Sequence, residues 1–149
     1  MTLTPHLLLG AAIASKIEYF PLAIILAFLS HYFLDLIPHI EYSINNISEK
    51  QWQKSLPDIL RVFLDFSFGI LLILIFSNNH LIIYICSFVA LIPDSLTIIS
   101  SIFPNIFLSK HDKFHTKKIH FLRHKKISIF WRILSQLLVI FISILLLIY

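Results

Sequence analysis

The sequence is poor in charged residues and in cysteine. Only 13% of its 149 residues are Asp, Glu, Lys or Arg, whereas 58% are hydrophobic. A typical soluble domain is about one quarter charged and about half apolar, so this composition predicts an integral membrane protein. The one cysteine, Cys86, lies in an apolar run. It has no partner for an internal disulfide, and we interpret it as a packing residue without a redox role.

The N-terminal residues lack the pattern of a cleavable secretion signal. Residues 1–6 contain no Lys or Arg, and the first apolar run is not followed by a polar mature region. A signal peptide needs a basic start before its apolar centre. We therefore expect residues 1–149 to form a single integral membrane domain, without internal repeats or low-complexity linkers.

Five apolar segments predict an all-α fold, a polytopic membrane bundle of about five helices. Pro5 and Pro21 stand where proline is favoured, in the first turn of a helix, and Pro93 interrupts the fourth segment. The expected helices cover residues 5–18, 20–37, 56–76, 80–103 and 127–149, with a basic, histidine-rich loop at 104–126.

Positive charge is concentrated in two connections, residues 38–56 and 104–126, which share one side if all the helices span. This side carries nine cations: Lys50, Lys54, Lys110, Lys113, Lys117, Lys118, Arg123, Lys125 and Lys126. The other side has little beyond Lys16. The positive-inside rule therefore predicts a multi-pass protein of the inner or plasma membrane, with the N-terminus and loop 104–126 in the cytoplasm.

One stretch, at the end of the second apolar segment, combines three residues that bind metals. His31, Asp35 and His39 follow at i, i+4 and i+8, which places them on one face of a helix. Ionisable groups are costly inside a membrane and usually mark a site. Two imidazoles and a carboxylate suit a divalent metal ion, zinc above all, with manganese as the alternative. The competing interpretation has histidines bonded to backbone carbonyls and Asp35 paired with a lysine.

The expected topology brings more polar side chains to the same level near the cytoplasmic face. Asp94 follows the interrupting Pro93 and needs a cation, either a metal ion or Arg61. The candidate metal ligands are therefore His6, His31, Asp35, His39, Asp94 and His111. One or two ions could be bound.

Two residues are candidates for proton transfer in catalysis, Asp65 and His115. Asp65 shares a helical face with Asp58 and Arg61, so an ion triplet is the alternative. His115 pairs with His111 at a spacing of four, and His120 and His124 repeat this spacing. For the second pair we favour a simple interfacial role.

The basic loop also predicts a lipid contact. Each cation near an anionic membrane surface is worth about 1 kcal/mol. We expect anionic phospholipid headgroups to bind at Lys110, Lys113, Lys117 and Lys118. Nucleic acid is a weaker expectation, because a loop held at the membrane meets anionic lipid first.

Four short motifs resemble a known family. They are Thr-Pro-His-Leu-Leu-Leu-Gly at 4–10, His-Tyr-Phe-Leu-Asp-Leu-Ile-Pro-His at 31–39, Leu-Ile-Pro-Asp at 91–94 and the His111/His115 pair. They resemble the bacterial membrane-bound, metal-dependent hydrolases, which are distantly similar to zinc-dependent phospholipase C. Where that family continues Pro-Asp-x-Asp-His, this chain has Leu96 and Thr97 in place of the second acid and the histidine.

The residues and the resemblance together predict a metal-dependent hydrolase at the cytoplasmic membrane face. Because the lysines of the basic loop could hold an anionic headgroup, we expect a phosphoester or lipid-like substrate. The alternative is a non-enzymatic membrane protein, such as a metal or ion carrier, an accessory subunit or a degenerate family member. An ion path needs polar groups at several depths, whereas here they crowd one side, which favours a site.

Overall fold

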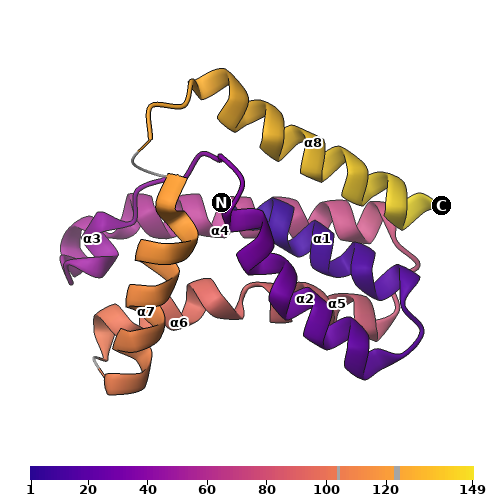
Figure 1. Ribbon diagram of the computed structural model, residues 1–149, viewed down its shortest axis with the longest axis horizontal. Helices are drawn as coiled ribbons and strands as arrows, with labels where there is room; N and C mark the ends of the chain where they lie inside the picture. Colours follow the sequence, from indigo (N-terminus) through magenta and orange to yellow (C-terminus); the bar gives the residue numbers. More distant parts are fainter. Residues whose placement is uncertain (104, 123–124) are drawn as a thin grey trace.

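The computed structural model describes residues 1–103, 105–122 and 125–149, without the side chains of Asn45 and Ser48, and this part of the chain is all-α (Figure 1). Arg123 and His124 lie outside the described residues. The helices are α1 (Leu3–Lys16), α2 (Phe20–Asp35), α3 (Asn45–Ser48), α4 (Leu56–Phe76), α5 (Leu81–Ala90), α6 (Ile92–Ile102), α7 (Ile106–Lys118) and α8 (Ile129–Ile148). Short 3-10 segments, η1 (Trp52–Lys54) and η2 (Ile119–Leu122), precede α4 and follow α7.

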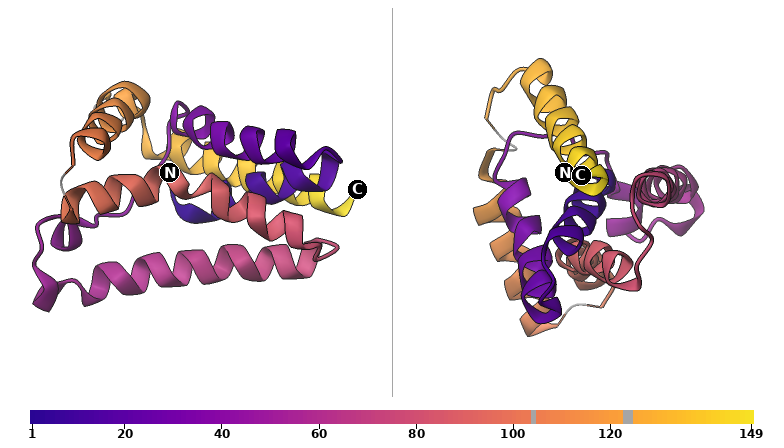
Figure 2. Two further views of the ribbon diagram at one scale, coloured as in Figure 1. Left: turned by 90° about the horizontal axis from the view of Figure 1, so that it is seen from below. Right: turned by 90° about the vertical axis from the view of Figure 1, so that its right-hand side faces the viewer.

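α1 is the central helix of the bundle. In the end-on view, α2, α4, α5 and α8 surround it (Figure 2). Leu7, Leu8 and Ala11 are fully buried. Gly10 lets the backbones of α1 and α5 approach, because a Cβ at this position would lie 2.7 Å from the carbonyl oxygen of Cys86. Small residues allow such close helix packing in membrane proteins.

Two helices, α4 and α8, are long and apolar enough to cross a membrane, with 21 and 20 residues. α5 and α6 would make a third span if they are counted together, although they are bent by 47°. Large apolar side chains on the outside, such as Phe63, Leu64 and Phe141, are more than half exposed. The expected multi-pass membrane character is thus supported by two or three candidate spans.

The segment expected as one helix over 80–103 is broken at Leu91, the residue between α5 and α6. Pro93 lies in the first turn of α6. Proline has no N–H for the preceding turn and its ring crowds that turn, so a new helix starts there. Asp94 is therefore in the first turn of a helix rather than in the middle of one.

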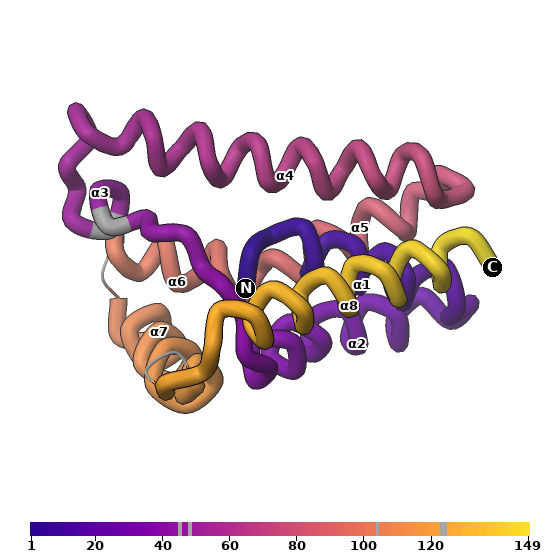
Figure 3. Tube along the Cα trace, turned by 90° about the horizontal axis from the view of Figure 1, so that it is seen from above, coloured from indigo at the N-terminus to yellow at the C-terminus, as the bar shows by residue number. Residues whose placement is uncertain are grey.

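The segment expected as a loop over 104–126 contains a helix, α7, which lies across one end of the bundle (Figures 1 and 3). Its start is capped by Asn105, whose side-chain oxygen accepts a hydrogen bond from Phe107 N at 3.1 Å. Its C-terminal turn carries His115, Lys117 and Lys118. Positive charge at this end of a helix interacts favourably with the helix dipole. η2 then returns the chain towards the bundle.

Asp65 fixes the level at which α1 begins. Its carboxylate accepts hydrogen bonds from Leu3 N at 2.5 Å and from Thr4 Oγ1 at 2.6 Å. Asp65 is nine residues beyond Leu56, the first residue of α4, so α1 begins roughly 13 Å along α4. Figure 3 shows this offset between the ends of the two helices. The N-terminus of α1 is thus recessed into the bundle.

Candidate metal centre

Asp35, the last residue of α2, is the centre of a cluster of buried polar side chains. Its side chain is fully buried, and ionised carboxylates are buried only when they are paired or bound to a metal. The Met1 ammonium lies 2.8 Å from its Oδ1. The imidazoles of five histidines also approach it, those of His6, His31, His39, His115 and His120.

Four residues, His31, Asp35, Asp94 and His115, contribute one ligand atom each to a compact group. The Nε2 atoms of His31 and His115 are 3.1 Å apart, and they lie 3.0 and 3.3 Å from Asp35 Oδ2. They lie 3.5 and 4.0 Å from Asp94 Oδ1. Ligand atoms about 2.0–2.1 Å from a tetrahedral zinc ion stand about 3.3–3.4 Å from one another. The spacing of the group therefore fits a divalent metal ion.

The helix break between α5 and α6 orients His31. Its Nδ1 lies 2.7 Å from the carbonyl oxygen of Ala90, the last residue of α5. When the N–H at Nδ1 donates to this carbonyl in the neutral imidazole, Nε2 carries the lone pair and faces Asp35. A metal-binding histidine is usually held in this way by a hydrogen bond from its other nitrogen. His39 also contacts a backbone carbonyl through Nδ1, at 2.7 Å from Ile37 O, but its Nε2 lies against Glu41.

A second group shares Asp35 and adds His39 and His120, all three buried. Nε2 of His39 lies 3.9 Å from Asp35 Oδ1, and Nε2 of His120 lies 3.2 Å from Oδ2. Glu41 links the two histidines, at 2.9 Å from His39 Nε2 and 2.7 Å from His120 Nδ1. From α8, Gln136 donates to Ile40 O at 2.9 Å and so holds the turn that carries His39.

The charges of this second group are mutually stabilised. Burial by itself lowers the pKa of His120, but hydrogen bonding to Asp35 and Glu41 raises it to about 9. Burial by itself raises the pKa of Glu41, and its bonds to His120 and His39 bring it well below the usual range. His120 and Glu41 thus form an ion pair. Because a histidine binds a metal in its neutral form, His120 would have to lose its proton before a metal binds there.

His6 reaches the cluster from the first turn of α1. Its ring is fully buried and stacks on the His31 ring, with centroids 4.1 Å apart. Nε2 lies 3.3 Å from Asp35 Oδ1, but neither ring nitrogen meets the criteria for a hydrogen bond among the described residues. A buried imidazole without a hydrogen bond is costly. The ring nitrogens of His6 are therefore candidates to bind a metal ion.

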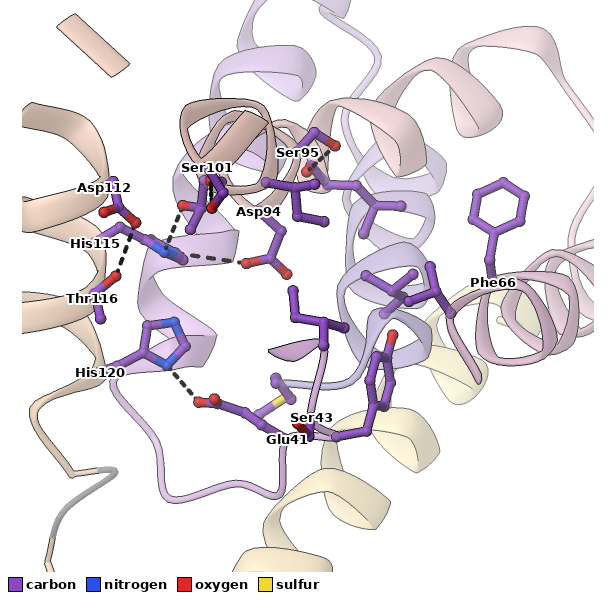
Figure 4. A pocket seen from close by; sticks show the side chains of 18 residues that line it. Glu41, Ser43, Phe66, Asp94, Ser95, Ser101, Asp112, His115, Thr116 and His120 are labelled. Carbon is purple, nitrogen blue, oxygen red and sulfur yellow. Dashed lines mark hydrogen bonds and ion pairs between the residues drawn. The ribbon is translucent and has the colours of Figure 1, made fainter. Parts of the chain in front are cut away.

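A chamber of about 580 Å³ adjoins the cluster between α4, α6, α7 and residues 41–44 (Figure 4). Asp94, His115 and His120 face into it, and Asp94 is 25% exposed while His31 and Asp35 are fully buried. The chamber therefore gives a ligand access to the first group through Asp94 and His115.

The structure brings together six of the eight candidate site residues: His6, His31, Asp35, His39, Asp94 and His115. His111 lies beside the cluster, with Nε2 3.0 Å from Tyr32 OH and its ring stacked on His115. Asp65 is bonded to the start of α1, as described above, and to Tyr42 OH at 3.2 Å. The alternative partner proposed for Asp94, Arg61, instead lies 3.5 Å from Asp58.

Sequence reasoning missed two members, His120 and Glu41. The sequence favours an interfacial role for His120 and His124, because basic stretches at a membrane interface mostly serve as topogenic charge or contact lipid headgroups. Glu41 is in an irregular connection, so no helical register points to it. The signal that could have indicated it is the presence of two polar residues, His39 and Glu41, within three positions after Pro38.

The lysines predicted to meet lipid headgroups lie on α7, the helix that also carries His115, but they are exposed whereas His115 is buried. Lys110, Lys113, Lys117 and Lys118 are exposed, and so are the apolar side chains of Ile106, Phe107 and Phe114. A helix with exposed lysines and aromatic side chains is typical of a membrane interface.

No family model, curated protein or solved structure matches this chain. The resemblance noted above is therefore carried by its short motifs alone. The described residues contain a buried His/Asp cluster that could hold a metal ion, together with two or three candidate membrane spans.

Proposed function

We propose that the protein is a metal-dependent hydrolase of the inner or plasma membrane, with the metal centre on the cytoplasmic side. The observation that carries this proposal is the spacing of 3.0–4.0 Å among the ligand atoms of His31, Asp35, Asp94 and His115. Zinc suits two imidazoles and two carboxylates best, and manganese is the alternative. A second ion could share Asp35 and use His39 and His120.

Four protein ligands would fill a tetrahedral zinc site, so a catalytic ion here would take a water as a fifth ligand. It would lower the pKa of that water and stabilise negative charge on a phosphoryl oxygen. The residues of the chain have separate tasks. His31 and Asp35, which are fully buried, would hold the ion on the side away from the chamber. Asp94 and His115, which line the chamber, would supply the other ligand atoms, so that a substrate in the chamber could reach the ion. In this proposal His115 is a ligand and Asp65 has no part in proton transfer.

The proposed substrate is a phosphoester, which is supported by the motifs that resemble metal-dependent hydrolases. The proposed orientation is supported by charge, because Lys110, Lys113, Lys117 and Lys118 all lie on α7 at the end of the bundle near the site. An anionic phospholipid headgroup is the expected partner of these lysines.

The test is zinc-dependent hydrolysis by protein reconstituted in liposomes, with a panel of phosphate monoesters and diesters. Asp94→Asn keeps the shape of the side chain but makes it a weaker metal ligand. Loss of a residue that only hydrogen-bonds to a metal ligand lowers activity roughly 10–100-fold, so we expect the rate to fall by at least this factor. Asp112→Asn is the matched control, because Asp112 lines the same chamber but bonds to Thr116 instead of the cluster. Zinc-loaded wild-type protein that hydrolyses none of the esters would contradict the proposal in favour of a non-enzymatic metal-binding protein.

A further inference from the structure

The chamber beside the metal centre is lined by both polar and apolar side chains. Its polar lining includes Glu41, Asp94, His115 and His120, and its apolar lining, here called the apolar wall, includes Leu3, Val62, Phe66, Leu91 and Ile98. Figure 4 shows Phe66 across the chamber from His115 and His120. A ligand with a polar end and an apolar end can contact both kinds of lining.

The apolar wall lies at the depth of acyl chains if α4 spans the membrane. Val62 and Phe66 are six and ten residues beyond Leu56, the first residue of α4, so they lie roughly 9 and 15 Å from its start. The hydrocarbon core of a bilayer is about 30 Å thick. An apolar chain at this wall is therefore at the depth of the acyl chains of the surrounding lipid.

The size of the chamber fits one such ligand. Its volume of about 580 Å³ is within the range of about 300–1,000 Å³ typical of small-molecule sites. Phe66 is held in place by Phe88 of α5, with ring centroids 5.9 Å apart. The wall is thus part of the packed bundle and is formed before a ligand arrives.

We propose that the chamber binds an amphiphile, with its apolar chain against Val62, Phe66 and Ile98 and its phosphate ester head at the metal centre. The position of the head rests on the proposed function; the position of the chain rests on the chamber alone. A chain in this place selects membrane lipids over soluble phosphoesters and fixes the distance of the ester from Asp94 and His115.

The test uses dodecyl phosphate with a diazirine at the end of its chain as a photolabel, on zinc-loaded protein in phosphatidylcholine nanodiscs. Peptide mass spectrometry locates the label. We expect it on Val62, Phe66 or Ile98, and at least tenfold less of it in Ile98→Trp, which fills the chamber. Ile99→Trp is the matched control, because Ile99 is the next residue of α6, is 42% exposed and does not line the chamber. It should keep the label within twofold.

Three results would overturn the proposal: label spread over outward side chains such as Phe63, undiminished label in Ile98→Trp, or equal labelling by dodecanol with the same diazirine. Should Ile98→Trp not fold, Val62→Trp fills the chamber from α4 and is judged by the same criteria. Zinc content is measured on every sample. Selective labelling of a protein that binds no zinc would support the chamber as an amphiphile site and would contradict the proposed hydrolase.

Discussion

Asp65 provides a test of whether a half-buried acid beside the cluster serves structure or chemistry. Its carboxylate accepts hydrogen bonds from Leu3 N, Thr4 N, Thr4 Oγ1 and Tyr42 OH, at 2.5, 3.3, 2.6 and 3.2 Å. It thereby caps the first turn of α1 from a neighbouring helix. The carboxylate is directed at this turn and does not belong to either group of ligand atoms.

The magnitude follows from these bonds. A hydrogen bond to a charged group contributes about 1.5–3 kcal/mol, and loss of a helix cap costs about 0.5–2 kcal/mol. Because the four bonds share one carboxylate, we expect Asp65→Ala to lower the free energy of unfolding by about 3–5 kcal/mol. Asp65→Asn keeps one acceptor oxygen and should cost about 1–2 kcal/mol. At about 2–4 °C per kcal/mol for a chain of this size, the alanine variant should unfold roughly 6–20 °C lower.

The assay is thermal unfolding in detergent with saturating zinc, combined with the zinc content of the folded fraction. Folded Asp65→Ala and Asp65→Asn should both bind as much zinc as the wild type. A second readout is the Tyr42 hydroxyl, whose pKa is raised by burial and then by the charge of Asp65; it should fall in Asp65→Asn. A variant that unfolds like the wild type but loses zinc or hydrolysis would refute the structural role and restore the catalytic one.

Three further predictions concern pH, packing and metal removal. The pKa of His120 is about 9 in the zinc-free protein, because two carboxylates outweigh the effect of burial. The protonated His120 therefore stabilises the fold fully below about pH 6.5, and this stabilisation is lost as the pH rises through 9. The unfolding temperature should thus fall more between about pH 7 and pH 10 in the wild type than in His120→Gln, and an equal fall would contradict the ion pair. Gly10→Ala should cost about 1–3 kcal/mol in chemical unfolding, because its Cβ meets the backbone oxygen of Cys86 at 2.7 Å. Gly69→Ala should cost less, since its Cβ meets the movable end of the Leu7 side chain, and the reverse order would argue against the packing described. Protein with free zinc at 100 times Kd should lose about 2.7 kcal/mol of its free energy of unfolding when a chelator removes the zinc. A thermal-shift assay measures this loss, and an unchanged melting curve would argue against a specific site.

The part of the site that could be predicted from sequence is the part fixed by local geometry. His31 and Asp35 are four residues apart on α2, and the helical repeat alone places them together, with Nε2 3.0 Å from Oδ2. Asp94 was identified because a carboxylate beside Pro93 in an apolar segment demands a partner. These inferences need only the helix period and the cost of burying a charge.

The remainder depends on packing that no local pattern encodes. α7 has few apolar residues and so no apolar period; it is placed by its contacts with α6 and η2 at the end of the bundle. His120 consequently reaches Asp35 from a segment that was expected to be a loop. Asp65 shows the same limit, because its partner is the first turn of α1, 62 residues earlier in the chain. Its helical face alone indicated pairing with Asp58 and Arg61.

The most direct test of the account is the metal content of the protein purified in detergent, loaded with zinc and freed of excess ion. Elemental analysis should find at least one zinc per chain in the wild type and in Asp112→Asn. It should find almost none in His31→Ala, which removes a ligand atom, and in Asp35→Asn, which replaces the central carboxylate of the cluster with a neutral and weaker ligand. Wild-type protein without bound metal, or zinc retained after both substitutions, would contradict the metal centre and everything derived from it.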